Sequence, residues 1–234
     1  MLPLLYIVRM DVEPDYLSDF VAWYDTRHGP DLIGTGFHSC NAYHSFTGSP
    51  FICNVYEITQ GVLESDAYVA VREHDRQLVD EVLHKISNHS NTVYSQEIVI
   101  DVPDEALRAD GRPSRAGAVS APVVSTIRLE LKGDALDRFE RWYRDEEVAV
   151  QRQRSGFLRA RVGRQSAKHP LFPSTQADWI VLTEWANADD ATADGSAEEV
   201  LGRYERGLGE GVSRLEYTAG GLSATLLNST NWTT

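Results

Sequence analysis

The sequence is poor in sulfur-containing residues and has no long apolar run. Among 234 residues there are two cysteines, Cys40 and Cys53, and two methionines. Two cysteines are too few for the disulfide framework of a small secreted domain, and no CxxC metal or redox motif is present. No stretch of about 18 apolar residues suggests a membrane-spanning helix. The first residues lack a basic leader and a small-residue cleavage site, so we expect a cytoplasmic location.

Basic residues are also in deficit. The chain has 35 Asp and Glu against 22 Lys and Arg, which gives a formal net charge of −13. Proteins that bind nucleic acid need a basic surface for the phosphates, so we expect no nucleic-acid partner, and no membrane partner either. The GxGxxG, phosphate-loop and GxSxG motifs are absent, and no set of metal ligands has a usable spacing. We therefore expect neither an organic cofactor nor a metal.

A short sequence pattern occurs twice. Phe20-Val-Ala-Trp23-Tyr24 recurs as Phe139-Glu-Arg-Trp142-Tyr143, an offset of 119 residues from Trp23 to Trp142. A Gly-Phe pair follows each copy, at 36–37 and 156–157. The hydrophobic fraction of 42% is enough for a packed core. The repetition predicts that the chain is a tandem duplication.

Hydrophobic periodicity predicts the order strand, helix, strand, strand, helix, strand in each half. The expected opening strands are 4–12 and 123–132, the helices 14–32, 66–86, 134–154 and 197–211, and the closing strands 91–101 and 215–227. This order is that of the ferredoxin-like βαββαβ motif, whose sheet has one bare face. We therefore predict an α+β fold in which two ferredoxin-like repeats, 1–101 and 123–234, joined by a linker at 102–122, form an intramolecular (pseudo-dimeric) α+β barrel.

Strand alternation predicts which side chains face the barrel interior. Carrying the alternation of the second half over to the first gives as helix-facing residues His38, Cys40, Ala42, His44, Cys53, Val55 and Glu57. If Phe46 pairs with Phe51, Cys40 lies opposite Glu57 and Cys53 opposite His44, so the two cysteines are offset and we expect no disulfide. In the second half, Leu158, Ala160, Val162, Ile180 and Leu182 form the apolar face that should pack on the helices. The expected interior residues are Phe37, Asn41, Tyr43, Asn54, Tyr56, Arg9, Arg128, Arg159, Arg161, Trp179, Thr183 and Trp185. Aromatic walls with a few polar groups are typical of a ligand pocket. The alternative is a solid interior whose polar groups satisfy one another.

The segment Trp23-Tyr-Asp-Thr-Arg-His28-Gly-Pro-Asp31-Leu, followed by Gly36-Phe37, resembles the EthD-like branch of the dimeric α+β barrel superfamily. The resemblance covers residues 4–58 well, the rest of the first half less well, and the second half in outline. Relatives include isomerases, polyketide monooxygenases and cyclases, decarboxylases, dehydratases, a hydroxynitrile lyase and haem-handling proteins. Much of this chemistry needs no cofactor. The resemblance implies that His28 lies at the mouth of the barrel pocket, and Glu147 replaces this histidine in the second half.

These residues suggest a catalytic arrangement. His28 is the expected acid/base, because an imidazole both accepts and donates protons near neutral pH. Asp31 is expected to orient it from a turn, since Gly29-Pro30 should end the helix. Tyr43 and Tyr56 are expected to steady negative charge on a substrate oxygen. The predicted substrate-binding residues are Arg9, Asn41, Asn54, Arg128, Arg161, Trp179 and Trp185. The alternatives are helix capping for His28, strand packing for the tyrosines, and ion pairs with residues such as Asp11 and Glu130 for the arginines.

The predicted function is that of a cofactor-independent enzyme for a small hydrophobic carbonyl or aromatic compound, polyketide-like or catabolic. Lyase, isomerase, cyclase and dehydratase reactions all fit. One alternative is a protein that binds haem or a small ligand without catalysis, with His28 or His44 as the candidate axial ligand of haem. Another is a cofactor-free monooxygenase with Trp179 and Trp185 beside its substrate. Association into a homodimer stays open.

Overall fold

The computed structural model describes residues 2–101, 119–167, 174 and 176–227. In this part of the chain, antiparallel strands close into a barrel in the order β1-β3-β2-β8-β5-β7-β6-β4. The strands are β1 Leu4–Val12, β2 Phe37–Ser45, β3 Ile52–Ile58, β4 Ile86–Asp101, β5 Val123–Leu131, β6 Phe157–Ala167, β7 Trp179–Trp185 and β8 Val212–Leu227. The two halves contribute the segments β4-β1-β3-β2 and β8-β5-β7-β6, which have the same order. Pairs β2–β8 and β4–β6 join the halves, so no sheet edge stays open.

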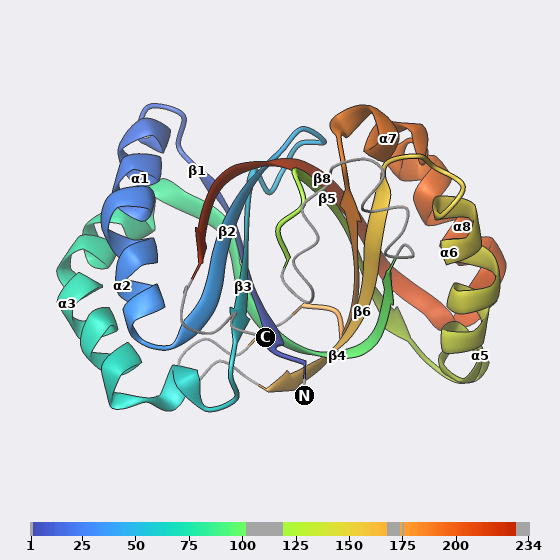
Figure 1. Ribbon diagram of the computed structural model, residues 1–234, viewed down its shortest axis with the longest axis horizontal. Helices are drawn as coiled ribbons and strands as arrows, with labels where there is room; N and C mark the ends of the chain where they lie inside the picture. The colour runs from blue at the N-terminus through green and yellow to red at the C-terminus, as the bar shows by residue number, and fades with distance from the viewer. Residues whose placement is uncertain (1, 102–118, 168–173, 175, 228–234) are drawn as a thin grey trace.

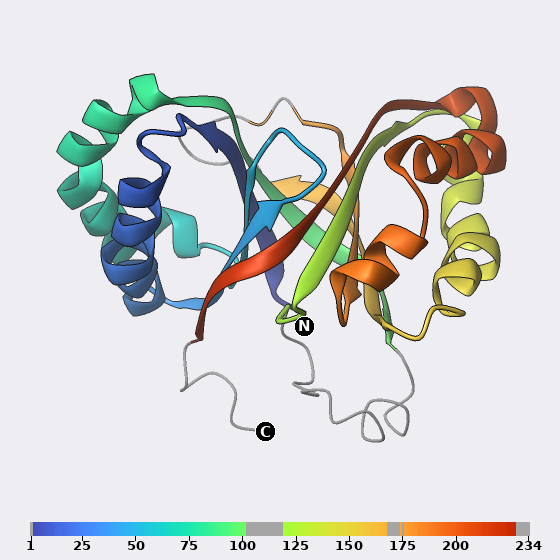
Figure 2. The ribbon, with the colours of Figure 1, turned by 90° about the horizontal axis from the view of Figure 1, so that it is seen from above.

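Helices cover the barrel on two opposite sides (Figures 1 and 2). The first side has α1 Leu17–Trp23, a π-turn at Tyr24–His28, α2 Gly29–Gly34 and α3 Asp66–Val82. The second side has α5 Asp134–Trp142, a π-turn at Tyr143–Glu147, α6 Val148–Gln151, α7 Ala188–Ala193 and α8 Ala197–Leu208. Short 3-10 turns occur at Val62–Glu64, Leu83–Lys85 and Gly209–Gly211. The structure confirms the predicted α+β class. Among the described residues, no helix is long and apolar enough to cross a membrane.

The prediction that Gly29-Pro30 ends the first helix is wrong. The backbone stays helical through the π-turn into α2, and the Gly29 N–H donates to the Tyr24 carbonyl five residues earlier. A π-turn widens the helix locally, so proline follows it without the usual break. The second half has a π-turn at the corresponding place although Ala149 stands where Pro30 does. The widened turn therefore does not depend on the proline.

The buried apolar residues form three cores. One lies between the first sheet segment and α1–α3 and includes Tyr6, Val8, Phe20, Tyr24, Cys40, Ala42, Tyr56 and Ile58. Its counterpart under α5–α8 includes Ile127, Leu129, Phe139, Trp142, Ala160, Val162, Trp185 and Tyr204. The third fills the barrel interior and consists mainly of Leu5, Ile7, Tyr43, Cys53, Val55, Tyr94, Val119, Val124, Ile180 and Leu182.

The β2–β3 hairpin has a different register from the one expected. Tyr43 pairs with Cys53 and Cys40 pairs with Tyr56, so Ser45 rather than Phe46 hydrogen-bonds with Phe51. A shift of one residue moves every side chain of a strand to the other face. The helix-facing prediction is confirmed for Cys40 and Ala42, and the interior prediction for Asn41 and Tyr43. Both predictions are wrong for β3. Its Cys53, Val55 and Glu57 face the interior, and its Asn54 and Tyr56 face the helices. Phe37, before a bulge in β2, is also on the helix side.

The same shift affects β7. Arg161 pairs with Leu182 and Gly163 with Ile180, so Ile180 and Leu182 belong to the interior core. Trp179, Thr183 and Trp185 lie instead on the helix side, which corrects their predicted interior position. Cys40 and Cys53 are both free, as expected, but for another reason: they face opposite sides of the sheet, and the pairing predicted for them is wrong. His44 lies on the helix side and Cys53 in the interior, so their side chains are not close enough to act together.

Candidate functional site

One end of the barrel interior is filled by the backbone that precedes β5. Val119 is fully buried there, and its carbonyl accepts a 2.7 Å hydrogen bond from Asn41 Nδ2. The Tyr43 hydroxyl donates to the Ala121 carbonyl at 3.1 Å, and the Val119 N–H donates to Glu57 at 3.1 Å. Burial raises the pKa of Glu57. Asn41 and Tyr43, predicted as site residues, thus bind the protein's own backbone.

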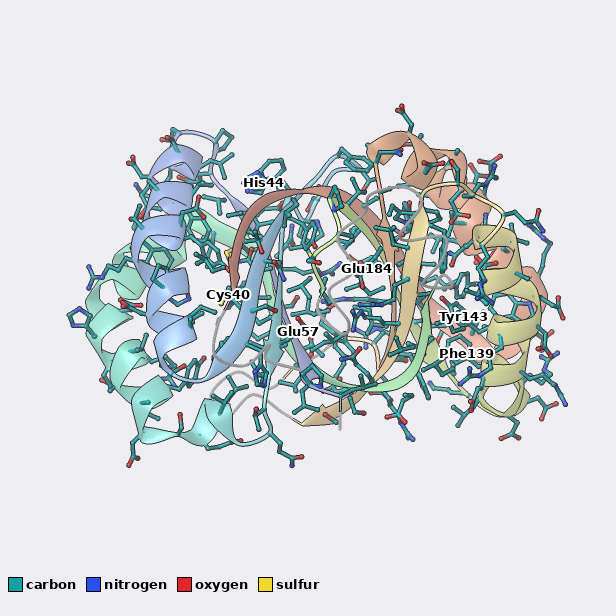
Figure 3. All side chains as sticks on the ribbon, in the orientation of Figure 1. Cys40, His44, Glu57, Phe139, Tyr143 and Glu184 are labelled. Carbon is teal, nitrogen blue, oxygen red and sulfur yellow. The ribbon has the colours of Figure 1, made fainter. Side chains whose placement is uncertain are left out.

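Arg161 is the second anchor of this end. Its Nε donates to Glu184 at 2.8 Å and its Nη1 donates to Gln96 at 2.8 Å. Figure 3 shows Glu57 and Glu184 inside the barrel, away from both helical layers. The arrangement matches the alternative in which interior polar groups satisfy one another. Arg9 and Arg128, also predicted for substrate binding, lie on the interior side of β1 and β5. They bond to Glu216 at 2.7 Å and to Gln176 at 2.7 Å, respectively.

His28 lies in the helical layer. Its ring stacks on Trp23 with centroids 4.5 Å apart, and its Nδ1 is 3.0 Å from an Asp75 carboxylate oxygen. Its side chain is 22% exposed. The hydrogen bond from His28 lowers the pKa of Asp75. Asp75 of α3, and not Asp31, therefore orients the imidazole. The acid/base role of His28 stays a prediction.

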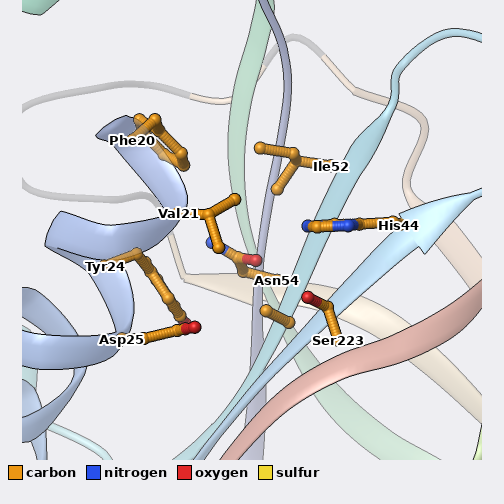
Figure 4. Close-up of a pocket in the computed structure, with 9 residues that line it drawn as sticks. Phe20, Val21, Tyr24, Asp25, His44, Ile52, Asn54 and Ser223 are labelled. Carbon is orange, nitrogen blue, oxygen red and sulfur yellow. The ribbon is translucent and has the colours of Figure 1, made fainter. Parts of the chain in front are cut away.

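The structure has a pocket on the helix side of the first half, between α1 and strands β2 and β3 (Figure 4). It is a shallow hollow with about 210 Å³ of empty space, open solvent included, and the cavity inside it measures about 10 Å³, which is room for about one water molecule. Its lining residues are Phe20, Val21, Tyr24, Asp25, Ala42, His44, Ile52, Asn54 and Ser223. In Figure 4 the His44 ring extends from its strand toward the helix that carries Tyr24 and Asp25. The walls are largely apolar, with a few polar groups between them.

A β-bulge in β8 contributes Ser223 to this pocket. Ala42 pairs with Ala224 and Tyr43 pairs with Leu222, so Ser223 has no partner residue on β2. Bulges redirect a side chain and often lie beside functional sites. Just before the bulge, a Cβ on Gly220 would lie 2.7 Å from the His44 carbonyl oxygen. Glycine at this position allows β8 to approach the strand residue that carries the imidazole.

One buried polar atom of the pocket residues, Asn54 Oδ1, has no hydrogen-bond partner among the described residues. Asn54 is only 2% exposed, and its Nδ2 donates to the Tyr56 hydroxyl at 3.3 Å. The Tyr24 hydroxyl also lies beside the Tyr56 hydroxyl. Buried polar atoms are nearly always hydrogen-bonded, since leaving them unpaired is costly. Asn54 Oδ1 is therefore available to a ligand in the pocket.

His44 and Asp25 form an electrostatic pair across the pocket. Burial lowers the pKa of His44 below its usual 6.5, and the Asp25 carboxylate partly offsets this. Burial raises the pKa of Asp25, and His44 counteracts the effect. Near pH 7 the imidazole is therefore neutral and competent as a base. Alternation correctly predicted a helix-facing His44, but the pocket was expected on the other face of the sheet. Polar His44 on an otherwise apolar helix-facing side of its strand is the sequence signal that could have pointed to it.

The second half has a tryptophan at the corresponding place. Trp179 opens β7 as Ile52 opens β3, and its ring packs edge-on against Phe139 at 5.3 Å. The Arg164 guanidinium lies over the Trp179 ring, 5.5 Å from its centroid. A large indole thus lies where the first half has a small aliphatic side chain. The pocket belongs to the first half.

The pocket does not fit a haem group. Pockets for drug-sized ligands measure about 300–1,000 Å³, and a porphyrin is larger than most such ligands. Elsewhere in the described residues, no group of three or more His, Cys, Asp or Glu side chains has the arrangement of a metal site.

Comparisons with known proteins identify the fold. No family model and no curated protein matches the sequence. A solved structure described as an anthrone oxidase-like protein is 11% identical, with a TM-score of 0.60 over 97% of this chain and 94% of its own. A candidate monooxygenase from Lactobacillus acidophilus NCFM is 12% identical, with a TM-score of 0.55 over 97% of both chains. A chlorite dismutase variant from Candidatus Nitrospira defluvii is 8% identical, with a TM-score of 0.52 over 94% and 91%. At such identities the likeness shows the fold alone.

Proposed function

We propose that this chain is a cofactor-independent enzyme that binds a small carbonyl or phenolic compound at the open mouth of the pocket between α1 and β2–β3 and transfers a proton there. The observation that carries the proposal is the half-buried His44 imidazole, which lines a largely apolar pocket together with the Asp25 carboxylate (Figure 4). This combination suits acid/base chemistry, because burial tunes the base and the carboxylate steadies the imidazolium that forms.

Each polar group of the pocket has a role in this reaction. His44 takes a proton from a carbon next to a carbonyl or from a phenol. Asn54 Oδ1 accepts a hydrogen bond from a substrate hydroxyl, and the Tyr24 hydroxyl donates to the oxygen on which negative charge develops. Phe20 and Ile52 contact the apolar ring of the substrate. Many lyase, isomerase and cyclase reactions of carbonyl compounds begin with such a proton transfer.

We further propose that the two halves are tandem repeats that form a pseudo-dimer, with units 1–101 and 123–234 and a linker at 102–122. The equal strand order of the halves and the π-turn that follows Trp23 and Trp142 support this origin. In this scheme the first repeat carries the chemistry and the second, filled by Trp179, supports the barrel.

Oxygen chemistry is a second candidate function. Two proteins of this fold are described as a candidate monooxygenase and as anthrone oxidase-like. Anthrone has an acidic CH₂ group between two aromatic rings, and removal of one of its protons by His44 gives an enolate. Reaction of the enolate with O₂ converts the CH₂ group into a carbonyl and releases one water. The same base serves both candidate functions, and only the fate of the enolate differs.

The proposal is tested with a panel of small carbonyl and phenolic compounds, anthrone included. Proton NMR in D₂O measures exchange of hydrogens next to the carbonyl, and an oxygen electrode measures O₂ consumption in parallel. We expect catalysed exchange for compounds that raise the melting temperature; O₂ uptake in addition identifies the oxidase. Neither exchange nor O₂ uptake for compounds that stabilise the protein contradicts the proposal.

Asp25→Asn is expected to shift the pH dependence of exchange. The reaction needs neutral His44, so the wild-type rate should fall as the pH drops through a midpoint below 6.5. Removing the Asp25 charge removes a group that stabilises the imidazolium, so the His44 pKa and the midpoint should fall further. Exchange rates measured from about pH 4 to 8 check this. A midpoint that stays fixed or rises means that Asp25 does not act on the base.

Ile52→Trp is expected to close the pocket. The second half already has tryptophan at this place, so the fold accommodates an indole there. Ligands that raise the melting temperature of the wild-type protein should no longer do so, while the circular dichroism spectrum stays the same. Trp179→Tyr is the matched control in the second half. If ligands stabilise Ile52→Trp as strongly as wild type, they bind elsewhere.

A further inference from the structure

We propose that the barrel interior binds a small anion, through carboxylate or phosphate oxygens, at the end where Arg9 and Arg128 lie. The arginine site comprises Arg9 on β1, Arg128 on β5, Ser90 and Tyr94 on β4, and Glu216 on β8. It is separate from the proposed catalytic pocket, because Cys53 beside the arginines and Asn54 in the pocket face opposite sides of the same strand.

The site holds two buried cations and one partly exposed anion. Arg9 is 4% exposed and Arg128 is 1% exposed, whereas the Glu216 side chain is 40% exposed at the edge of the site. Arg9 forms the ion pair with Glu216, and its Nη2 lies 2.7 and 2.9 Å from the two carboxylate oxygens. In the described part of the chain, Arg128 has no carboxylate within ion-pair distance; its Nη1 donates to the neutral Gln176 amide at 2.7 Å. The sequence from 168 to 175 just before Gln176 contains no Asp or Glu.

This imbalance is costly, because a buried charge without an ion-pair partner loses its hydration and gains only a weak attraction in return. Burial and the nearby Arg9 charge lower the pKa of Arg128, while Tyr94 and Glu216, its cross-strand partner, act in the opposite direction. Arg161 and Arg203 provide the contrast within the same protein. Arg161 pairs with Glu184, and Arg203 with both Glu147 and Asp194. Arg128 is therefore a buried cation that a bound anion would stabilise.

Unpartnered hydrogen-bond donors define the kind of anion. Arg9 Nε and Nη1, and Arg128 Nε and Nη2, have no hydrogen-bond partner among the described residues. The Ser90 hydroxyl has none either, and the Tyr94 hydroxyl lies beside the Thr92 side chain. The Nε and Nη2 atoms of Arg128 form one edge of its guanidinium, which matches two oxygens of a carboxylate or phosphate. Donors without acceptors exclude a metal cation. One monoanion would satisfy the donors and balance the second arginine.

Isothermal titration of the purified protein with inorganic phosphate and, separately, with benzoate tests this inference. Both titrations use a constant ionic strength set with sodium chloride. We expect saturable one-to-one binding of at least one of the two anions, and their relative affinities distinguish a phosphate site from a carboxylate site. No saturable binding of either anion overturns the proposal. No substrate is involved, so the result is independent of the function proposed for the catalytic pocket.

Arg128→Met and Arg164→Met form a matched pair of variants. Both remove one positive charge, but Arg164 lies exposed on the outer side of the barrel over Trp179. Arg128→Met should weaken anion binding at least about tenfold, and Arg164→Met should leave it unchanged. In chloride alone, the melting temperature of Arg128→Met should equal or exceed that of wild type, because an unpaired buried charge is lost. Equal anion affinities for Arg128→Met and wild type overturn the assignment.

Discussion

Replacing His44 with glutamine is expected to lower the rate of proton exchange by about 10²–10⁴-fold, the usual contribution of a general base. Glutamine keeps a polar side chain of similar reach in the pocket but does not accept a proton near neutral pH. Substrate binding should persist, because Phe20, Ile52 and Asn54 still line the pocket. Exchange rates by proton NMR, with ligand-dependent melting temperatures on the same samples, separate loss of chemistry from loss of binding.

His28→Ala is the control for this experiment. His28 contacts Trp23 and Asp75 in the helical layer, so its removal should destabilise the protein by about 1–3 kcal/mol through lost packing and an unpaired carboxylate. Exchange by the folded variant should stay within about twofold of wild type. The opposite outcome, with His28→Ala inactive and His44→Gln active, would restore His28 as the acid/base and remove His44 from that role.

Arg161→Met is expected to cost about 3–5 kcal/mol of unfolding free energy. Arg161 is fully buried and bonds to Glu184 and Gln96, so the substitution leaves a carboxylate inside the barrel without its main partner. The Glu184 carboxylate has a second cationic neighbour, Arg159, but the distance from Arg159 Nη1 to Glu184 Oε1 is 3.9 Å, so this ion pair is weaker. Urea denaturation followed by circular dichroism measures the loss.

The double variant Arg161→Met with Glu184→Leu removes both charges and serves as the comparison. It should recover most of the stability, because replacing a whole buried ion pair by apolar side chains is often neutral. A loss below about 1 kcal/mol in the single variant would mean that water reaches this end of the barrel. Water, and not only the protein's own polar groups, would then satisfy the side chains at this end of the interior.

The local pattern of the sequence predicted the fold class and most strand positions. The first strand was expected at 4–12, and β1 spans Leu4–Val12. The last strand was expected at 215–227, and β8 spans Val212–Leu227. These predictions succeed because alternation and apolar periodicity are properties of neighbouring residues. The closing strands start earlier than expected because pairing with partners from elsewhere in the chain extends them.

The register of the hairpins decided which side chains of β3 and β7 face the interior, and alternation along a single strand does not specify this register. Phe46 and Phe51 are the natural aromatic pair, yet the loop places Ser45 opposite Phe51. That single step moves Asn54 from the interior to the helix side and brings it into the same pocket as His44. The candidate site followed from this shift, because the residues that line it come from α1, β2, β3 and β8.

The sequence by itself determined the α+β class, the repeated strand–helix order, the helix-facing position of His44 and the interior position of Arg9 and Arg128. Each of these follows from periodicity along one element. Only the tertiary structure decided that Asp25 faces His44, that Asp75 rather than Asp31 orients His28, and that Arg161 is paired while Arg128 is not. These contacts join residues of separate elements, and their formation depends on register and packing that no local pattern specifies.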